Sequence, residues 1–409
     1  MVKRVVLLVC DGLADRPIKE FGYKSPLEAA RTPHLDRLAK ESVCGMVHTL
    51  GRGRVPGSDV AHLEIFGYPI EKYYAGRGPI EVCGLGMKLQ GGDVALRGNF
   101  ATVDKDWNIV DRRAGRINHV APLCAAIDGI EIDGVKFLVH PGTGHRAGVI
   151  MRGEGLSDKI IDADPHGPGE PVRTVTATDA SPEARRTAEV LNRFLRKSYE
   201  ALGGLDLNRQ RAKEGKLPAN ILLVRGAGQH IHAPSFSERY GLKACAIAGG
   251  GLYKGVGSFV GMDVVEVPGA TGLPDTDIAA KFRAVLAKLA EYDFVFVHVK
   301  AADSLGEDGN APGKKDFVEK IDAAAKILAE GLPEDVLLVA TADHTTPCEM
   351  KAHAADPVPI MFRGNNVRVD GVAAFGERAC AQGGLGFMLG REIMPQVVNF
   401  LGKGHLEGA

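Results

Sequence analysis

Short runs of apolar residues recur along the chain and predict its strands. They consist mainly of valine, leucine and phenylalanine and do not alternate with polar residues. Continuous apolar runs are typical of strands that are buried on both faces of a sheet. The four clearest runs lie at residues 4–9, 220–224, 293–299 and 335–341.

Segments with a helical pattern lie between many of these strands. Residues 33–43 open with Pro33, which suits the first position of a helix because no N–H is required there. Apolar side chains at spacings of three and four predict further helices at residues 183–199, 277–291 and 314–330. Strands that alternate with helices predict an α/β fold with a doubly wound, mostly parallel sheet.

The middle of the chain follows a different pattern. From about residue 91 to 215 the polar and glycine content rises, and the alternation of strands and helices weakens. The stretch "DVALRGNFATVDKDWNIVDRRAGR" indicates strands and turns, and "LNRQRAKEGKLPAN" indicates a charged connection. We therefore predict an inserted α+β domain at 91–215, between the parts of a main domain at 1–90 and 216–409.

Composition and charge exclude some classes of function. The 409 residues are 45% hydrophobic and 25% charged, and their net charge is −1. Without an excess of basic residues we expect neither a nucleic-acid partner nor a membrane-surface role. The seven cysteines lack zinc-type spacing, and the first apolar run ends at Asp11, too early for a signal peptide. These features predict a cytoplasmic protein with reduced thiols.

Acidic residues follow three of the predicted strands, at the end where open parallel sheets bind ligands. Carboxylates together with imidazoles suit Mn²⁺, Zn²⁺ or Mg²⁺, and two such ions can hold both sides of a phosphoryl transfer. Taken singly, each Asp could equally be a cap or turn residue and each His a structural residue. The joint pattern favours a metal site formed by Asp11, Asp303, Asp343, His344 and His353.

The stretch "GRVPGSDVAHL" contains a candidate nucleophile, Ser58, at the apparent start of a helix. Backbone N–H groups at a helix start can meet an anion. Serine is a weak nucleophile unless a base or a metal lowers its pKa. This stretch alone favours the simpler role of a helix N-cap for Ser58.

Arginines in the middle region form a candidate anion site, because guanidinium binds phosphate and carboxylate in a bidentate manner. In isolation "DRRAGR" would more commonly be a solvated face. Lys254, in the glycine-rich "GGGLYKGVG", is a further candidate in the main domain. The candidate substrate-binding residues are Arg97, Arg112, Arg113, Arg116, His145, Arg146, Asp164, His166 and Arg225.

Together these stretches resemble the archaeal-type 2,3-bisphosphoglycerate-independent phosphoglycerate mutases of the alkaline phosphatase superfamily. The resemblance runs in register over nearly the whole chain. It rests on "CDGLADRPI", "PGSDVAHLEIFGY", "GRGPIEVCGLG", "ALRGNFATVD", "DRRAGRI", "GTGHRA", "DADPH", "RGAG", "KGVG", "PGATG", "TADHTTPCE" and "HAADPVP".

The resemblance implies an isomerase that interconverts 3- and 2-phosphoglycerate in glycolysis and gluconeogenesis, with two divalent metal ions and no bisphosphoglycerate. It implies that Ser58 carries the phosphoryl group as a phosphoserine and also binds the first metal with Asp11, Asp343 and His344. It further implies that Asp303 and His353 bind the second metal. Lys254 matches a lysine that neutralises the phosphoryl group in transfer.

One position departs from the family pattern. In "DSLGEDG" Glu307 stands where the family has a histidine ligand, and Asp308 fits a turn residue. A carboxylate can replace imidazole but is a harder ligand, so Glu307 should favour Mn²⁺ or Mg²⁺ over Zn²⁺ or Co²⁺. If Glu307 is not a ligand, the second site is weak and the activity is altered.

Three other functions remain open at this stage. The phosphoserine could be passed to another acceptor, as in homoserine kinase-like relatives, or to water, as in a phosphatase. The chain could also be an inactive scaffold that binds phosphorylated metabolites. Arginines suited to a small carboxylate favour phosphoglycerate as the small-molecule partner, and a homo-oligomer is compatible with the sequence.

Overall fold

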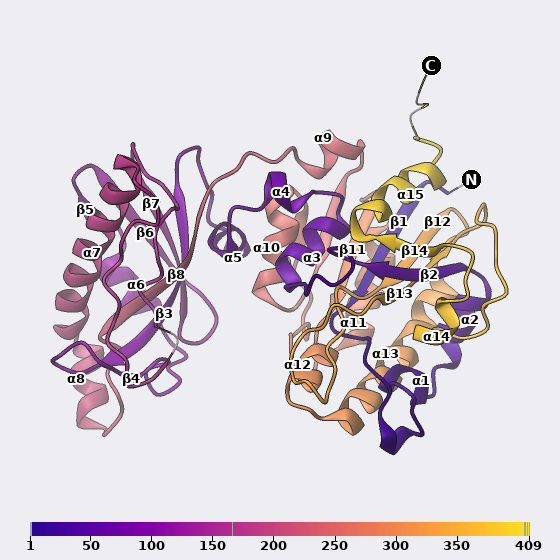
Figure 1. Ribbon diagram of the computed structural model, residues 1–409, viewed down its shortest axis with the longest axis horizontal. Coiled ribbons are helices and arrows are strands. Elements are labelled where there is room, and N and C mark those ends of the chain that lie inside the picture. Colours follow the sequence, from indigo (N-terminus) through magenta and orange to yellow (C-terminus); the bar gives the residue numbers. More distant parts are fainter. Residues whose placement is uncertain (1, 166, 405, 407, 409) are drawn as a thin grey trace. The chain divides into compact units, whose positions relative to one another are not determined.

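The computed structural model describes residues 2–165, 167–404, 406 and 408, and the chain divides into two compact units (Figure 1). Residues 1–74 and 234–409 form the first unit, and residues 75–233 form the second. The boundaries therefore lie outside the predicted limits of 91 and 215. The reason is that α5 (Arg77–Gly84) and β8 (Ile221–Gln229), which fall within the predicted main domain, both pack on β3 (Val94–Val103) of the second unit.

The first unit is built on an eight-stranded, mostly parallel sheet with the strand order β10-β9-β11-β1-β12-β13-β2-β14. Strand β13 is antiparallel to both of its neighbours. Every residue of β11 and β12 is buried, so both faces of the sheet centre are covered. The strands are β1 (Arg4–Cys10), β2 (Val43–His48), β9 (Ala244–Ile247), β10 (Asp263–Val265), β11 (Phe294–Val299), β12 (Val336–Thr341), β13 (Val358–Arg363) and β14 (Gly386–Leu389).

Helices of the first unit contact one another in two groups. In one group α13 contacts α1, α2, α11 and α12, and in the other α3 contacts α10 while η2 contacts α3 and α15. The predicted helices at 33–43, 277–291 and 314–330 are confirmed as α2, α11 and α13. The helices are η1 (Lys19–Phe21), α1 (Pro26–Ala29), α2 (Pro33–Lys40), α3 (Ser58–Ile65), α4 (Ile70–Tyr73), α9 (Phe236–Tyr240), α10 (Gly251–Phe259), α11 (Ile278–Lys288), α12 (Ala301–Glu307), α13 (Ala311–Gly331), α14 (Glu377–Cys380), η2 (Gly390–Glu392) and α15 (Ile393–Phe400).

The second unit is an antiparallel sheet with the order β4-β3-β7-β6-β5, in which β8 also pairs with β3. The strand predicted at 220–224 is therefore real but belongs to this sheet and not to the parallel one. The predicted charged connection contains helix α8, and the helix predicted at 183–199 is α7. The elements are α5 (Arg77–Gly84), β3 (Val94–Val103), β4 (Ile109–Asp111), α6 (Ala121–Ile127), β5 (Glu131–Ile132), β6 (Val135–Pro141), β7 (Arg146–Arg152), α7 (Pro182–Gly203), α8 (Asp206–Lys213) and β8 (Ile221–Gln229).

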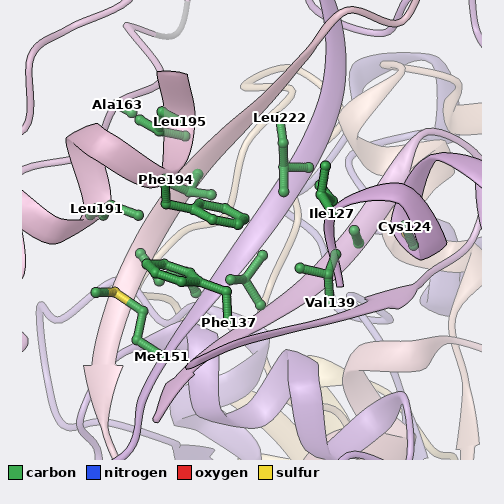
Figure 2. Packing of buried hydrophobic residues seen from close by; sticks show 14 of the residues in the cluster. Cys124, Ile127, Phe137, Val139, Met151, Ala163, Leu191, Phe194, Leu195 and Leu222 are labelled. Carbon is green, nitrogen blue, oxygen red and sulfur yellow. The ribbon is translucent and has the colours of Figure 1, made fainter. Parts of the chain in front are cut away.

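The main core of the second unit lies between the sheet and helices α6 and α7 (Figure 2). Phe137 of β6 and Phe194 of α7 stack with their ring centroids 3.9 Å apart, and both are fully buried. Burial of each ring stabilises the unit by roughly 1.5–3 kcal/mol. Helix α5 lies very close to β3, and glycine at position 78 makes this possible. A Cβ atom added at Gly78 would lie only 2.2 Å from the carbonyl oxygen of Ala95.

The described part of the chain contains no helix with the length and apolar character needed to cross a membrane.

Candidate metal centre

Three adjacent strands bring the predicted ligands to one edge of the parallel sheet. Strand β1 lies between β11 and β12, with Cys10 beside Val299 and Val9 beside Thr341. The chain segments that follow these three strands therefore begin side by side. They carry Asp11, then Asp303 on α12, and then Asp343 and His344.

Asp11, Asp343 and His344 form the first group of candidate ligands, and all three are buried. His344 Nε2 lies 3.4 Å from Asp11 Oδ1 and 3.2 Å from Asp343 Oδ2. Among the described residues, neither of these two oxygens has a hydrogen-bond partner. Buried oxygens without a donor are costly unless something positive meets them, so this group fits a bound cation.

The charge balance of the first group points to the same conclusion. Burial, reinforced by the neighbouring Asp343, raises the pKa of Asp11 to about 7. Burial, reinforced by Asp303, raises the pKa of Asp343 to about 6. The raised pKa values mean that ionising these two buried carboxyl groups is costly in the absence of a cation. A divalent ion would offset this cost and the repulsion between the carboxylates.

Asp303, His344 and His353 form the second group. His353 Nε2 lies 3.3 Å from Asp303 Oδ1, while His353 Nδ1 bonds to the carbonyl oxygen of Pro56 at 2.8 Å. The rings of His344 and His353 stack 3.6 Å apart. Glu307, at the end of α12, approaches this group with Oε1 3.8 Å from His353 Nε2, and its side chain is half exposed. The structure thus brings Glu307 close to the second group.

Ser58 is the first residue of α3, with its Oγ 3.1 Å from His344 Nε2. The N-cap residue is Gly57, and the side chain of Ser58 does not cap the helix. The alternative of a simple N-cap is therefore wrong, because the hydroxyl turns towards the first ligand group instead of the backbone.

A lysine that our sequence analysis did not select lies between the two groups. Lys300 Nζ is 2.8 Å from Asp303 Oδ2 and 3.6 Å from Asp11 Oδ2. Burial lowers the pKa of Lys300, but the two carboxylates outweigh burial and hold this pKa above its usual range. Its position three residues before Asp303 was the available signal. Lys254, by contrast, forms an ion pair with the exposed Glu266 at 2.7 Å.

Tyr253 was also missed. Its hydroxyl donates a hydrogen bond to Asp11 Oδ2, and its ring stacks on the buried His298 at 3.5 Å. Gly12, directly after Asp11, has a φ of +60°, and a Cβ added there would lie 2.6 Å from the Cα of Asp303. Only glycine allows the loop after β1 to approach helix α12 so closely.

The second unit contains all six predicted substrate-binding arginines. Arg97 on β3 faces Arg225 on β8 in the strand register, and Arg112 forms a bidentate ion pair with the buried Asp164 at 3.1 and 2.5 Å. Burial, reinforced by the charges of Arg146, Arg113 and Arg97, lowers the pKa of His145 to about 4. This sheet therefore carries a concentrated positive charge.

The remaining residues of this region differ in their surroundings. Arg113, Arg116 and Arg146 are exposed. His166 lies outside the described residues. Glu81, which we did not predict, accepts a hydrogen bond from Arg77 at 3.0 Å and lies 3.6 Å from Arg97.

Comparisons with known proteins define the class. The sequence profile of the Metalloenzyme superfamily matches residues 3–399, and the chain belongs to this superfamily. A 2,3-bisphosphoglycerate-independent phosphoglycerate mutase of Methanocaldococcus jannaschii is 46% identical over 409 residues, which is 99% of each chain. A counterpart from Archaeoglobus fulgidus is 46% identical and covers 97% of this chain and 98% of its own. The chain thus belongs to the family of 2,3-bisphosphoglycerate-independent phosphoglycerate mutases.

Solved structures agree with this assignment. The cofactor-independent phosphoglycerate mutase from Thermoplasma acidophilum has a TM-score of 0.75 and 36% identity, covering 98% of this chain and 100% of the other. A Pyrococcus horikoshii protein has a TM-score of 0.85 and 34% identity, with complete coverage of both chains.

Proposed function

We propose that the chain interconverts 3-phosphoglycerate and 2-phosphoglycerate without bisphosphoglycerate, through a phosphoserine formed on Ser58. The observation that carries this proposal is the position of the Ser58 hydroxyl, 3.1 Å from Nε2 of the buried His344. His344 belongs to both candidate ligand groups, so the nucleophile lies where two cations would be held. The start of α3 adds backbone N–H groups that favour an anion.

Two divalent ions fit the residues present. Asp11, Asp343 and His344 would hold one, together with the oxygen of Ser58, and Asp303, His353 and Glu307 would hold the other. When bound, such ions neutralise phosphoryl charge and lower the pKa of a hydroxyl group. The predominance of carboxylate oxygens supports Mn²⁺ or Mg²⁺, with Zn²⁺ or Co²⁺ as less suited alternatives.

The proposed reaction consists of two successive displacements at phosphorus. The Ser58 hydroxyl loses its proton as its oxygen forms a bond to the phosphorus of 3-phosphoglycerate, the bond from phosphorus to the glycerate oxygen breaks, and that oxygen takes up a proton. The second glycerate hydroxyl then loses its proton and attacks the same phosphorus, the bond from phosphorus to the Ser58 oxygen breaks, and Ser58 regains a proton. The transferred group carries charge throughout, so Lys300 and the bound cations would contribute mainly by electrostatic stabilisation.

The second unit would act as the substrate-binding domain that retains glycerate between the two displacements. The proposal is supported by Arg97 and Arg225, which are paired on adjacent strands and carry guanidinium groups suited to a small carboxylate or phosphate. Arg112, which forms an ion pair with Asp164, is a further candidate. The remaining candidates for this role are Arg113, Arg116, His145, Arg146 and Asp164.

All seven cysteines are free, which agrees with a reducing, cytoplasmic location for this chemistry.

The test is a coupled assay with 3-phosphoglycerate and no bisphosphoglycerate, repeated with Mn²⁺, Mg²⁺, Co²⁺ and Zn²⁺. We expect metal-dependent formation of 2-phosphoglycerate, and mass spectrometry should find a phosphoryl group on Ser58. Ser58→Ala should abolish both signals while retaining bound metal. Release of inorganic phosphate faster than formation of the isomer would identify a phosphatase instead.

A further inference from the structure

The side chain of Thr346 lies between the two candidate ligand groups. Thr346 is fully buried in the loop after β12. Its Oγ1 lies 3.0 Å from His344 Nδ1 and 2.9 Å from Asp303 Oδ1. One hydroxyl group thus contacts a member of the first group and a member of the second, although it is a member of neither.

Donor and acceptor rules fix the direction of these hydrogen bonds. An ionised carboxylate only accepts hydrogen bonds, so the Thr346 hydroxyl donates its one hydrogen bond to Asp303. The oxygen of Thr346 must then accept a hydrogen bond from His344, whose Nδ1 therefore carries the proton. This places the lone pair of His344 on Nε2, the atom that faces Asp11, Asp343 and Ser58. Ser58 completes the chain by donating to Nε2.

The surroundings of Thr346 hold it in place. Its backbone N–H donates to the carbonyl oxygen of Ala14 at 3.1 Å, and its own carbonyl oxygen accepts from the buried Lys314 at 2.9 Å. Two glycines have no side chain that would clash with Thr346. A Cβ added at Gly12 would lie 2.6 Å from Thr346 Oγ1, and one at Gly306 would lie 2.6 Å from the carbonyl oxygen of Thr346.

We propose that Thr346 is a positioning residue that sets the geometry of both metal sites through one hydroxyl group. It holds the His344 ring with Nε2 towards the first site and holds Asp303 towards the second. The inference rests on the two-metal centre of the proposed function, but not on the identity of the substrate. Loss of this hydroxyl should therefore weaken both sites together.

The test compares Mn²⁺ binding to the full-length wild type, Thr346→Val and Thr346→Ser by titration calorimetry, without substrate. Valine has nearly the same shape but no hydroxyl, so we expect the affinity of both sites to fall by about 10–100-fold. Serine keeps the hydroxyl, so Thr346→Ser should bind Mn²⁺ with nearly the affinity of the wild type at both sites. Thr345→Val is the matched control, because the neighbouring Thr345 hydroxyl donates to the backbone oxygen of Asp356, at 3.0 Å, and among the described residues it bonds to none of the candidate ligands.

Each result has a separate meaning. If Thr346→Val weakens Mn²⁺ binding at a single site, Thr346 serves that site alone. If Mn²⁺ affinity is unchanged at both sites, Thr346 is a packing residue. Either result overturns the proposal. Nitrogen-15 NMR of His344 in the wild type provides a second test that needs no variant. A proton on Nδ1 is expected, and a proton on Nε2 would overturn the proposal. If wild-type Mn²⁺ binding is normal but isomerisation is absent, the proposed function fails and this inference stands.

Discussion

Lys314 Nζ lies 2.9 Å from Asp15 Oδ2, with side-chain exposures of 0% and 1%. The same ammonium group donates to the carbonyl oxygens of Ala14 and Thr346 at 3.0 and 2.9 Å. Asp15 in turn accepts from the N–H of Cys348. This buried ion pair at the start of α13 therefore ties together the loop after β1 and the loop after β12, which carry most of the candidate ligands.

Replacement of Lys314 by Met should lower the free energy of unfolding by about 3–5 kcal/mol, because it leaves the Asp15 carboxylate buried without a partner. Urea denaturation followed by circular dichroism measures this loss. The double variant Lys314→Met with Asp15→Leu should recover part of it, since the uncompensated charge is removed. A single variant as stable as the wild type would show that the pair contributes nothing to stability.

Glu307 offers a prediction about metal preference. Because its Oε1 lies 3.8 Å from His353 Nε2, Glu307→His should shift the second site from Mn²⁺ towards Zn²⁺ while activity with Mn²⁺ is retained or raised. Dissociation constants for both ions, measured on both proteins, test the shift. Asp308→Asn, at the exposed neighbouring acid, is the control and should change neither constant. A loss of activity as large as that of Asp303→Ala would show that Glu307 has another role.

The parts of the site that could be predicted are those encoded in short stretches. Asp11 and Asp343 directly follow continuous apolar runs, and parallel strands place their carboxyl ends at one edge of the sheet. Local pattern alone therefore suffices to bring these acids together. The apolar run of strand β8 resembles a strand of the parallel sheet, so the prediction placed it in the wrong sheet. Its pairing with β3 depends on tertiary contacts, which the local sequence pattern does not show.

The connecting residues could not be predicted in this way. Thr346 has an ordinary sequence context, and only its distances to His344 and Asp303 reveal its position. Lys300 lay within the acidic stretch but was not selected, since a lysine there is usually a solvated side chain. The role expected for Ser58 as an N-cap failed because Gly57 occupies that position.

Arg97 allows a test of the second unit. Burial lowers the pKa of Arg97 to about 10, so it remains charged at neutral pH, and its Nε has no hydrogen-bond partner among the described residues. Arg97→Lys keeps the charge but loses the planar fork, so the KM for 3-phosphoglycerate should rise by about 10–100-fold. Arg193→Lys, at an exposed ion pair with Asp133, should leave KM unchanged. Equal effects of the two substitutions would argue against a substrate role for Arg97.

The pKa of His353 predicts how the stability of the metal-free protein depends on pH. Burial alone lowers this pKa, but the hydrogen bonds to Asp303 and to the carbonyl oxygen of Pro56 raise it to about 9. A histidine with a raised pKa stabilises the folded state fully below its unfolded pKa of about 6.5, and this contribution is lost as the pH rises through 9.

After removal of metal, the stability advantage of the wild type over His353→Gln should therefore fall by up to about 3 kcal/mol between pH 6 and pH 9.5. Urea denaturation at several pH values measures this advantage for both proteins. With saturating Mn²⁺ the trend should reverse in the wild type, because a metal ligand must be the neutral imidazole and protons compete with the ion at low pH. An advantage that stays constant or grows with pH in the metal-free proteins would contradict the ion pair between His353 and Asp303.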